Sequence, residues 1–460
     1  MKTFSCLALS TEDLALCDAF DGNFVLGAAT AAYQIEGSAS ADGRGPSIWD
    51  TFSHTPGKTI NGDTGDVACD HYRRWKDDVN LMHSLSLEAY RFSIAWSRVQ
   101  PNGSGAWNPM GLDFYDRLVD GLLEKSIQPH ATLYHWDLPQ ALQDKGGWAN
   151  RDTALRFADY AETIASALGD RLVTLSTHNE PYCTATLGHE LGKFAPGFRD
   201  PALATQVSHH LLLSHGLAMK AMRSVSPKAA LGIVLNQSPA TPATDSAKDK
   251  ELANLLYAKF VRWYMDPIFL GRYPDQAGIE HYPEVHAGDM ALISAPIDFL
   301  GINYYTRLWA SASTPSVPAP NALGVNDMGW ETYPSGLGDL LLGHLDHYRL
   351  PPIYICENGM ACADQLRDGA VSDPARIEYV RGHLASLARA RRGGVDIRGY
   401  LYWSLMDNYE WDSGYAKRFG LVHVDYPTQT RTVKASGHWY RELIEAKQRS
   451  TATEKKAIGA

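Results

Sequence analysis

The chain lacks any hydrophobic run long enough to cross a bilayer, and it lacks an excess of positive charge. Its formal net charge is −10 at pH 7, so the phosphates of a nucleic acid would be repelled rather than attracted. Its 6 cysteines are scattered, without the close spacing of a zinc site or the density of a small disulfide-stabilised domain. We therefore expect free thiols and a cytoplasmic location, with neither nucleic acid nor a membrane as a partner.

The N-terminus has no clear targeting signal. A short apolar stretch, Phe4–Leu9, follows one lysine, and it leaves secretion open as the alternative location. The polar residues Thr11–Asp13 come directly afterwards, and no small-residue cleavage site is obvious. We expect residues 1–23 to form a loosely ordered N-terminal arm and residues 24–449 to form a single folded domain. We expect residues 450–460, which are small and charged, to be a frayed C-terminal tail.

Glycine-rich phosphate-binding turns, internal repeats and breaks in composition are also missing. What is present is a series of short β-branched or aromatic runs that alternate with longer stretches of helical periodicity, such as Ala154–Leu168 and Ser208–Met222. Eight runs are expected to be strands: Phe24–Thr30, Leu87–Trp96, Pro129–Trp136, Leu172–His178, Ala230–Asn236, Ile297–Tyr305, Pro352–Cys356 and Ile397–Ser404.

This pattern predicts an α/β fold, a single (β/α)₈ TIM barrel whose long βα loops form a deep active-site cleft. An open, doubly wound sheet is the alternative, but it would usually carry a glycine-rich turn after its first strand. Two stretches rich in Pro, Ser, Ala and Asp, Ser238–Lys250 and Ser311–Met328, are expected to be long surface loops.

Polar residues gather where the expected strands end, which is where barrel enzymes assemble their sites. Glu180 and Glu357 follow the fourth and seventh strands, on opposite sides of a barrel, so both carboxylates are expected to face one central cleft. Two facing carboxylates suit the hydrolysis of an acetal, which needs a proton donor and an anion at the reacting carbon. Either glutamate alone would more often be a surface ion-pair partner, and His135 or Trp403 alone a structural residue. Their joint position at strand ends favours a catalytic interpretation.

Eight segments, in this order and rough spacing, resemble glycoside hydrolase family 1, the β-glucosidase family, from about Phe24 to about Glu445. The segments are Ala31–Gly37 (AAYQIEG), Ser47–Phe52 (SIWDTF), Tyr90–Arg98 (YRFSIAWSR), His135–Pro139 (HWDLP), Asn179–Pro181 (NEP), Gly301–Tyr305 (GINYY), Glu357–Gly359 (ENG) and Trp403–Trp411 (WSLMDNYEW).

The resemblance implies a retaining β-glycosidase without a cofactor, which hydrolyses terminal β-D-glucosidic bonds through a glycosyl-enzyme intermediate. It makes Glu180 the general acid/base and Glu357 the nucleophile, with their carboxyl groups about 5–5.5 Å apart. The supporting residues that it implies are Arg91, Asn179, Asn303 and Tyr305. The sugar-binding residues that it implies are Gln34, His135, Trp136, Trp403, Glu410, Trp411 and Phe419. On the aglycone side we expect Tyr182, Leu187, His189 and Trp330.

Two departures from the family pattern flank the expected catalytic residues. His178 precedes Asn179, and we expect it to point behind its strand as a buried histidine; a role in tuning the pKa of Glu180 is the alternative. Cys356 precedes Glu357 and is expected to be a small packed residue. Glu at position 180 excludes the thioglucosidase branch, which has Gln there. Glu410 implies a neutral sugar rather than a 6-phosphosugar, with glucose and galactose both open.

His209, His210 and His215 share one helical stretch, but no carboxylate joins them at ligand spacing, so we expect no catalytic metal. Hydrolysis is the leading hypothesis for the reaction. Net transglycosylation uses the same residues, and a catalytically inactive, sugar-binding barrel is the alternative from another functional class. The oligomeric state stays open at this level.

Overall fold

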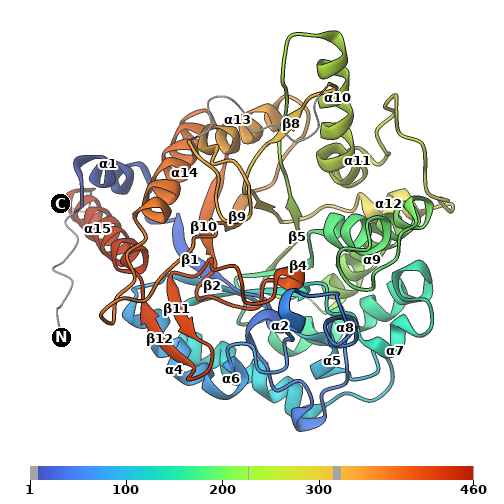
Figure 1. Ribbon diagram of the computed structural model, residues 1–460, viewed down its shortest axis with the longest axis horizontal. Helices are drawn as coiled ribbons and strands as arrows, with labels where there is room; N and C mark the ends of the chain where they lie inside the picture. The colour runs from blue at the N-terminus through green and yellow to red at the C-terminus, as the bar shows by residue number, and fades with distance from the viewer. Residues whose placement is uncertain (1–8, 226, 314–322, 459–460) are drawn as a thin grey trace.

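Eight parallel strands close into a barrel at the centre of the molecule (Figure 1). The computed structural model describes residues 9–225, 227–313 and 323–458. The order around the barrel is β1-β10-β9-β7-β5-β4-β3-β2, which confirms the predicted (β/α)₈ barrel. The strands are β1 (Val25–Ala29), β2 (Ala89–Ser93), β3 (Gln128–Tyr134), β4 (Thr174–Asn179), β5 (Ala230–Asn236), β7 (Phe299–Asn303), β9 (Ile353–Asn358) and β10 (Ile397–Trp403).

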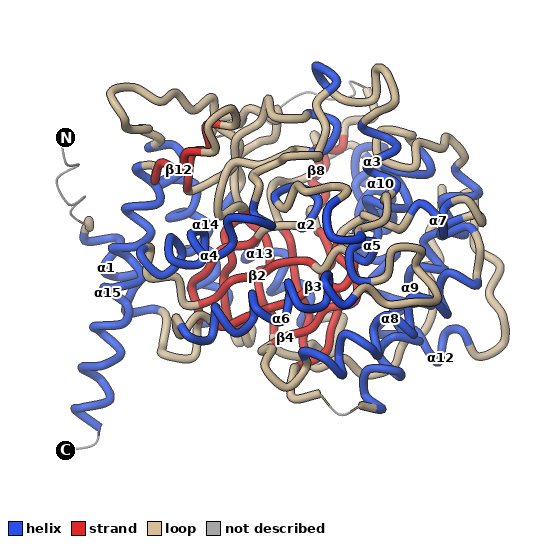
Figure 2. The backbone as a smooth tube through the Cα atoms, turned by 90° about the horizontal axis from the view of Figure 1, so that it is seen from below, coloured by secondary structure: helices blue, strands red, loops and turns tan. Residues whose placement is uncertain are grey.

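The barrel strands are covered on their outer face by helices, and Figure 2 shows the strands enclosed between them. Every residue of β1, β2, β4 and β7 is buried, as expected for parallel strands that are packed on both faces. The longer helices are α4 (His71–Ser84), α6 (Pro109–Glu124), α8 (Asp152–Leu168), α9 (Pro201–Ser224), α10 (Ala247–Tyr257), α11 (Trp263–Leu270), α13 (Pro334–Leu345), α14 (Pro374–Arg392) and α15 (Ala435–Ile458). Shorter helices lie in the connections: α2 (Ala32–Ile35), α3 (Ile48–Ser53), α5 (Trp96–Val99), α7 (Gln140–Gln143) and α12 (Asp289–Ile293).

Helix α8 illustrates how the sequence specifies this outer layer. Phe157, Tyr160, Ile164 and Leu168 recur at three- and four-residue spacing, and all four are buried against the barrel. Within the described ranges, no helix is both long enough and apolar enough to span a membrane.

Two strand boundaries differ from the sequence prediction in ways that matter for the site. Strand β9 runs on to Asn358, so Glu357 lies inside the strand rather than after it. Strand β2 ends at Ser93, because Trp96 begins the short helix α5.

The expected loop Ser238–Lys250 contains regular structure, which corrects that prediction. Strand β6 (Ala240–Pro242) pairs in parallel with β8 (Leu308–Ala310), and helix α10 begins at Ala247. The Ser246 side chain caps this helix by accepting a hydrogen bond from the backbone N–H of Asp249. Of the other expected loop, Ser311–Met328, residues 314–322 lie outside the described residues. A second small sheet, β11 (Val422–Asp425) with β12 (Thr430–Val433), follows the last barrel strand.

Both terminal segments contain helix where the sequence suggested loose or frayed chain. Helix α1 (Thr11–Ala19) starts with a capping box between Ser10 and Asp13, a signal that the sequence contained. Asp13 also pairs with Arg381 of α14 at 2.8 Å, which holds α1 against the barrel. Helix α15 continues to Ile458, and Figure 1 shows α1 beside it. The remaining arm residues, 1–8, and the last two residues, 459–460, lie outside the described residues.

Candidate active site

A cavity of about 320 Å³ lies at the carboxyl ends of the barrel strands. Both glutamates line it, with most of the predicted sugar-binding and aglycone residues: His135, Trp136, Glu180, Tyr182, Leu187, Asn303, Tyr305, Trp330, Glu357, Trp403, Glu410, Trp411 and Phe419. A neighbouring cavity of about 350 Å³ shares Tyr182, Phe260 and Leu308 but contains neither glutamate. The chemistry of the lining, not the volume, identifies the first cavity as the candidate site.

Glu357 is held by donors on both of its carboxylate oxygens. Arg91 Nη1, from β2, lies 2.6 Å from Oε1, and the Tyr305 phenol donates to Oε2 at 2.7 Å. Burial raises the pKa of Glu357, while the Arg91 charge and the hydrogen bonds from Arg91, Tyr305 and Asn303 act in the opposite direction. Burial and the Glu357 charge hold the pKa of the Tyr305 phenol well above its ordinary value, so it stays a donor. These contacts favour an ionised Glu357.

Glu180 has fewer charged donors than Glu357. Asn303 Nδ2 donates to Oε1 at 2.6 Å, and the Cys183 thiol donates to Oε2 at 3.0 Å. Burial first, and then the charge of Glu357, raise the pKa of Glu180 to about 7, against the lowering effect of these hydrogen bonds. Glu180 also has a left-handed backbone with φ of 48°, an uncommon conformation for a residue other than glycine, and such conformations cluster at functional sites. Glu357 accepts from a guanidinium and a phenol, whereas Glu180 hydrogen-bonds no charged donor, and this difference favours a proton on Glu180 over one on Glu357.

The two carboxylates are connected through a chain of side chains on four strands. Arg91 Nη2 donates to Asn179 Oδ1 at 2.7 Å, and Asn303 Nδ2 donates to the same oxygen at 3.0 Å. Since Arg91 also contacts Glu357 and Asn303 contacts Glu180, a displacement of either residue would disturb both carboxyl groups. Arg91 and Asn179 lie behind the cavity lining and orient the residues that face it.

Aromatic rings form one wall of the cavity. The ring of His135 is nearly parallel to those of Trp403 and Trp411, at interplanar angles of 17° and centroid distances of 5.8 and 5.9 Å. Trp136 packs on Trp411 at 4.6 Å and donates its indole N–H to the backbone oxygen of Asn179 at 2.8 Å. Flat apolar faces beside hydrogen-bonding groups are suited to the mixed surface of a pyranose ring.

Glu410 is a further carboxyl group in the cavity, and it lies beyond β10. Gln34 Nε2 is 3.4 Å from Glu410 Oε2 and also donates to Asn408 Oδ1 at 2.9 Å. Burial, then Asp412 and Glu357, raise the pKa of Glu410 to about 8. Gln34 itself lies behind the lining, and its Oε1 is buried without a hydrogen-bond partner.

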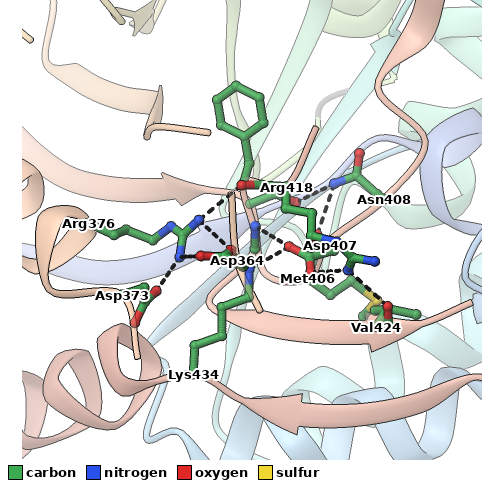
Figure 3. Close-up of polar contacts among 12 residues, drawn as sticks. Asp364, Asp373, Arg376, Met406, Asp407, Asn408, Arg418, Val424 and Lys434 are labelled. Atoms are coloured by element: carbon green, nitrogen blue, oxygen red, sulfur yellow. Dashed lines mark hydrogen bonds and ion pairs between the residues drawn. The ribbon is translucent and has the colours of Figure 1, made fainter. Parts of the chain in front are cut away.

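A buried network of charges supports the segment that carries Asn408 and Glu410 (Figure 3). Lys434 Nζ lies 2.6 Å from Asp407 Oδ1 and 2.5 Å from Asp364 Oδ2. Arg418 pairs with the other oxygen of Asp407 at 2.7 Å. Arg376 joins Asp364 at 2.8 Å and also pairs with Asp373, the residue before α14. Three carboxylates and three cations thus balance one another at the base of the β10 loop.

One predicted aglycone residue is placed wrongly by the sequence argument. His189 is buried, its Nδ1 bonds the Thr184 backbone oxygen at 2.8 Å, and it does not line the cavity. The segment Cys183–Glu190 is a π-helix, so side-chain directions differ from those that strand or α-helix spacing would give. The histidines considered as metal ligands are bound elsewhere: His209 to Tyr273 and Asp289, His210 to the Trp148 backbone oxygen, and His215 to Thr177.

The two departures beside the glutamates have structural explanations. His178 points behind β4, where its Nε2 bonds Ser214 Oγ of α9 at 2.7 Å and its ring stacks on Phe157 at 4.5 Å. This confirms the first interpretation of His178 as a buried, bonded histidine. Cys356 is buried, and burial raises the pKa of its thiol to about 12, in agreement with a packed, unreactive residue.

The sequence argument missed several cavity residues, of which Cys183 is the closest to the chemistry. Its position three residues after Glu180, at the start of a helical segment, is the signal that could have found it. Phe194 and Phe260, from connections, and Asn236, the last residue of β5, also line the cavity and belong to no distinctive motif.

Comparison with known proteins identifies the family of the chain. The sequence model of glycosyl hydrolase family 1 matches residues 16–449. β-Glucosidase A of Acetivibrio thermocellus is 48% identical over 442 residues, covering 93% of this chain and 98% of that protein. A β-glucosidase of Agrobacterium sp. is 46% identical over 444 residues, covering 94% of this chain and 97% of that protein.

A solved structure gives the same result for the fold. The β-glucosidase of Thermotoga maritima in complex with glucoimidazole superposes with a TM-score of 0.90 at 44% identity, covering 93% of this chain and 99% of that chain. The chain therefore belongs to glycosyl hydrolase family 1.

Proposed function

We propose that the chain hydrolyses terminal β-D-glucosidic bonds by retaining double displacement, with Glu180 as general acid/base and Glu357 as nucleophile. The observation that carries this proposal is the unequal environment of the two glutamates. Glu357 accepts from a guanidinium and a phenol, whereas burial and the neighbouring carboxylate raise the pKa of Glu180 to about 7. One group thus starts as an anion and the other as an acid, which is the assignment that glycosyl transfer to the enzyme requires.

In the first step, the Glu357 carboxylate attacks the anomeric carbon while Glu180 gives its proton to the leaving oxygen. The bond between the anomeric carbon and the leaving oxygen breaks, and a glycosyl ester of Glu357 forms. Loss of the negative charge on Glu357 removes the repulsion that raised the pKa of Glu180. Glu180 can then remain ionised.

In the second step, Glu180 acts as the base. Its carboxylate takes a proton from water as the water oxygen attacks the anomeric carbon, and Glu357 leaves as a carboxylate. Arg91 and Tyr305 stabilise the charge that returns to Glu357.

The aromatic wall of the cavity and the polar groups around it are proposed to bind the sugar. Trp403 and Trp411 offer stacking faces, and His135 and Glu410 offer hydrogen-bonding groups to a ring of hydroxyls. The carboxyl group of Glu410 is poorly suited to a 6-phosphate, which supports a neutral sugar. The three relatives described above are β-glucosidases, which supports glucose as that sugar. Tyr182, Leu187 and Trp330 line the same cavity and are proposed to contact the aglycone.

Labelling with 2-deoxy-2-fluoroglucosyl fluoride tests the proposal. The reagent should inactivate the enzyme and modify the peptide that contains Glu357, because the 2-fluoro group slows both steps while the fluoride leaving group keeps formation of the glycosyl ester faster than its breakdown. Modification of another residue would refute the assignment, and an intact active chain without modification would refute the covalent mechanism.

The acid/base role is tested by replacing Glu180 with Gln. The rate with cellobiose, whose leaving group needs a proton, should fall by about 10²–10⁴-fold. The glycosylation rate with dinitrophenyl glucoside should fall far less, because that leaving group departs without protonation. Equal losses with both substrates would contradict the assignment.

A further inference from the structure

Cys183 contacts the carboxyl group of Glu180 directly, although the proposed mechanism gives it no role. Its thiol lies 3.0 Å from Glu180 Oε2, and its backbone N–H donates to the Glu180 carbonyl at 2.9 Å. It is the first residue of the π-helical segment, so the turn after Pro181 brings it back over the glutamate. Both Cys183 and Glu180 line the cavity.

The orientation of the thiol is set by a second contact. Asn236, the last residue of β5, has its Nδ2 at 3.9 Å from the Cys183 sulfur, which is within the range for a donor to sulfur. An N–H directed at the sulfur leaves the thiol hydrogen free to point at Glu180. Burial and the charges of Glu180 and Glu357 hold the pKa of the Cys183 thiol well above its ordinary value, with Lys193 as the opposing charge, so the group stays a thiol.

The other carboxyl oxygen of Glu180, Oε1, already accepts a hydrogen bond. Asn303 Nδ2 donates to Oε1 at 2.6 Å, and an amide donor favours a carbonyl-like oxygen over a hydroxyl. A proton on the carboxyl group is therefore placed on Oε2, the oxygen beside Cys183. A thiol is a weak donor, so it can share Oε2 with this proton at little cost, where a stronger donor would favour the ionised form.

We propose that Cys183, oriented by Asn236, is a positioning residue that hydrogen-bonds Oε2 of Glu180, the oxygen that Asn303 leaves to exchange the proton with the leaving group and with water. The inference rests on the proposed role of Glu180. The thiol keeps its own hydrogen throughout: Oε2–H protonates the leaving oxygen in the first step, and Oε2 accepts a proton from water in the second.

The equilibrium between protonated and ionised Glu180 depends on all the charged and titratable groups that face this residue. Glu357 of β9 disfavours its ionisation and Arg91 of β2 favours it, while Tyr305 and Glu410 lie within electrostatic range on the connections after β7 and β10. A change confined to Cys183 leaves these groups in place. It therefore isolates the contribution of the thiol.

The test is the pH dependence of kcat/KM for cellobiose, whose alkaline limb reports the ionisation of the general acid in the free enzyme. In Cys183→Ser the hydroxyl is a stronger donor to the carboxylate, so the limb should move to lower pH by about half to one unit. In Cys183→Ala the donor is lost, so the limb should move to higher pH by a similar amount, about half to one unit. Opposite shifts from two small substitutions are not expected of a residue that only fills space.

Cys362→Ser is the matched control, because Cys362 is a half-buried thiol outside the cavity and its replacement should leave the limb unchanged. Thermal midpoints establish that each variant is folded, and titration of active sites with the fluorosugar gives the concentration of active enzyme. Shifts in the same direction for Ser and Ala, or no shift in either, would overturn the inference.

The Glu180→Gln variant separates this outcome from a failure of the proposed function. If that variant discriminates between cellobiose and dinitrophenyl glucoside while the Cys183 variants leave the limb unmoved, only the role of Cys183 is refuted. If it does not discriminate, the acid/base assignment itself is refuted.

Discussion

Replacing Lys434 with Met should destabilise the protein strongly. The Lys434 ammonium is fully buried, 2.5 Å from Asp364 and 2.6 Å from Asp407, and its loss leaves three buried carboxylates facing two cations, Arg376 and Arg418. Breaking a buried ion pair from one side costs about 3–5 kcal/mol, because a buried charge loses its partner. This corresponds to about two to three and a half orders of magnitude in the unfolding equilibrium constant.

The loss should depend on pH in a defined direction. The Lys434 and Arg418 charges, against burial, lower the pKa of Asp407 in the folded state. A carboxyl group with a lowered folded pKa contributes stability above its unfolded pKa, about 3.9, and this contribution is lost as pH falls through the folded pKa. The difference between wild type and Lys434→Met should therefore be largest near neutral pH and should shrink in acid. Urea midpoints measured across this range, together with inactivation rates on heating, provide the assay.

Lys447→Met is the matched control for this experiment. Lys447 is almost as buried, and its Nζ lies 2.7 Å from Glu88 Oε2, which precedes β2 at the opposite end of the barrel from the cavity. Both variants should lose stability. Only Lys434→Met should raise the KM for a β-glucoside substrate, because Asp407 adjoins the segment that carries Asn408 and Glu410. A Lys434→Met protein as stable as wild type, or an equal rise of KM in both variants, would refute the reasoning.

Two further outcomes follow from the carboxyl groups of the cavity. Sugar hydroxyls favour an ionised Glu410, whose pKa is raised to about 8, so glucose should bind the Glu180→Gln variant more tightly as pH rises toward 8. Adding Glu410→Gln should abolish this dependence in calorimetric titrations; its persistence would assign the proton elsewhere. Arg91→Met removes the charge that favours ionised Glu357, so the acid limb of kcat/KM for dinitrophenyl glucoside should move to higher pH. An unmoved acid limb would contradict the role given to Arg91.

The strands and most cavity residues could be predicted because they share one physical cause. Buried parallel strands need apolar runs, and a barrel brings the ends of all these runs to one face. The polar residues that follow the runs, such as Glu180, Asn303 and Glu410, could therefore be assigned to the same cavity without coordinates.

The errors lie where local geometry departs from regular spacing. His189 was assigned to the cavity from its distance along the chain, but the π-helical turn points it toward Phe198 and the Thr184 backbone oxygen. Helix α1 was missed because its buried face is short and depends on α14 and α15, hundreds of residues away. Contacts of this kind leave little signal in the neighbouring sequence.

The seam between β1 and β10 also determines when the site can exist during folding. Ala29 pairs with Trp403 across this seam, and Gln34 and Glu410, which follow the two strands, meet only once it has closed. Helix α15 secures the closed seam, because Tyr440 donates to the Gly27 carbonyl and Lys447 to the Phe24 carbonyl. When the chain is synthesised from its N-terminus, the sugar-binding residues that follow β1 and β10 therefore come together only late, and the seam between these strands is secured only after helix α15 has been made. Glycosidase activity would then report closure of the whole ring rather than the folding of any one part.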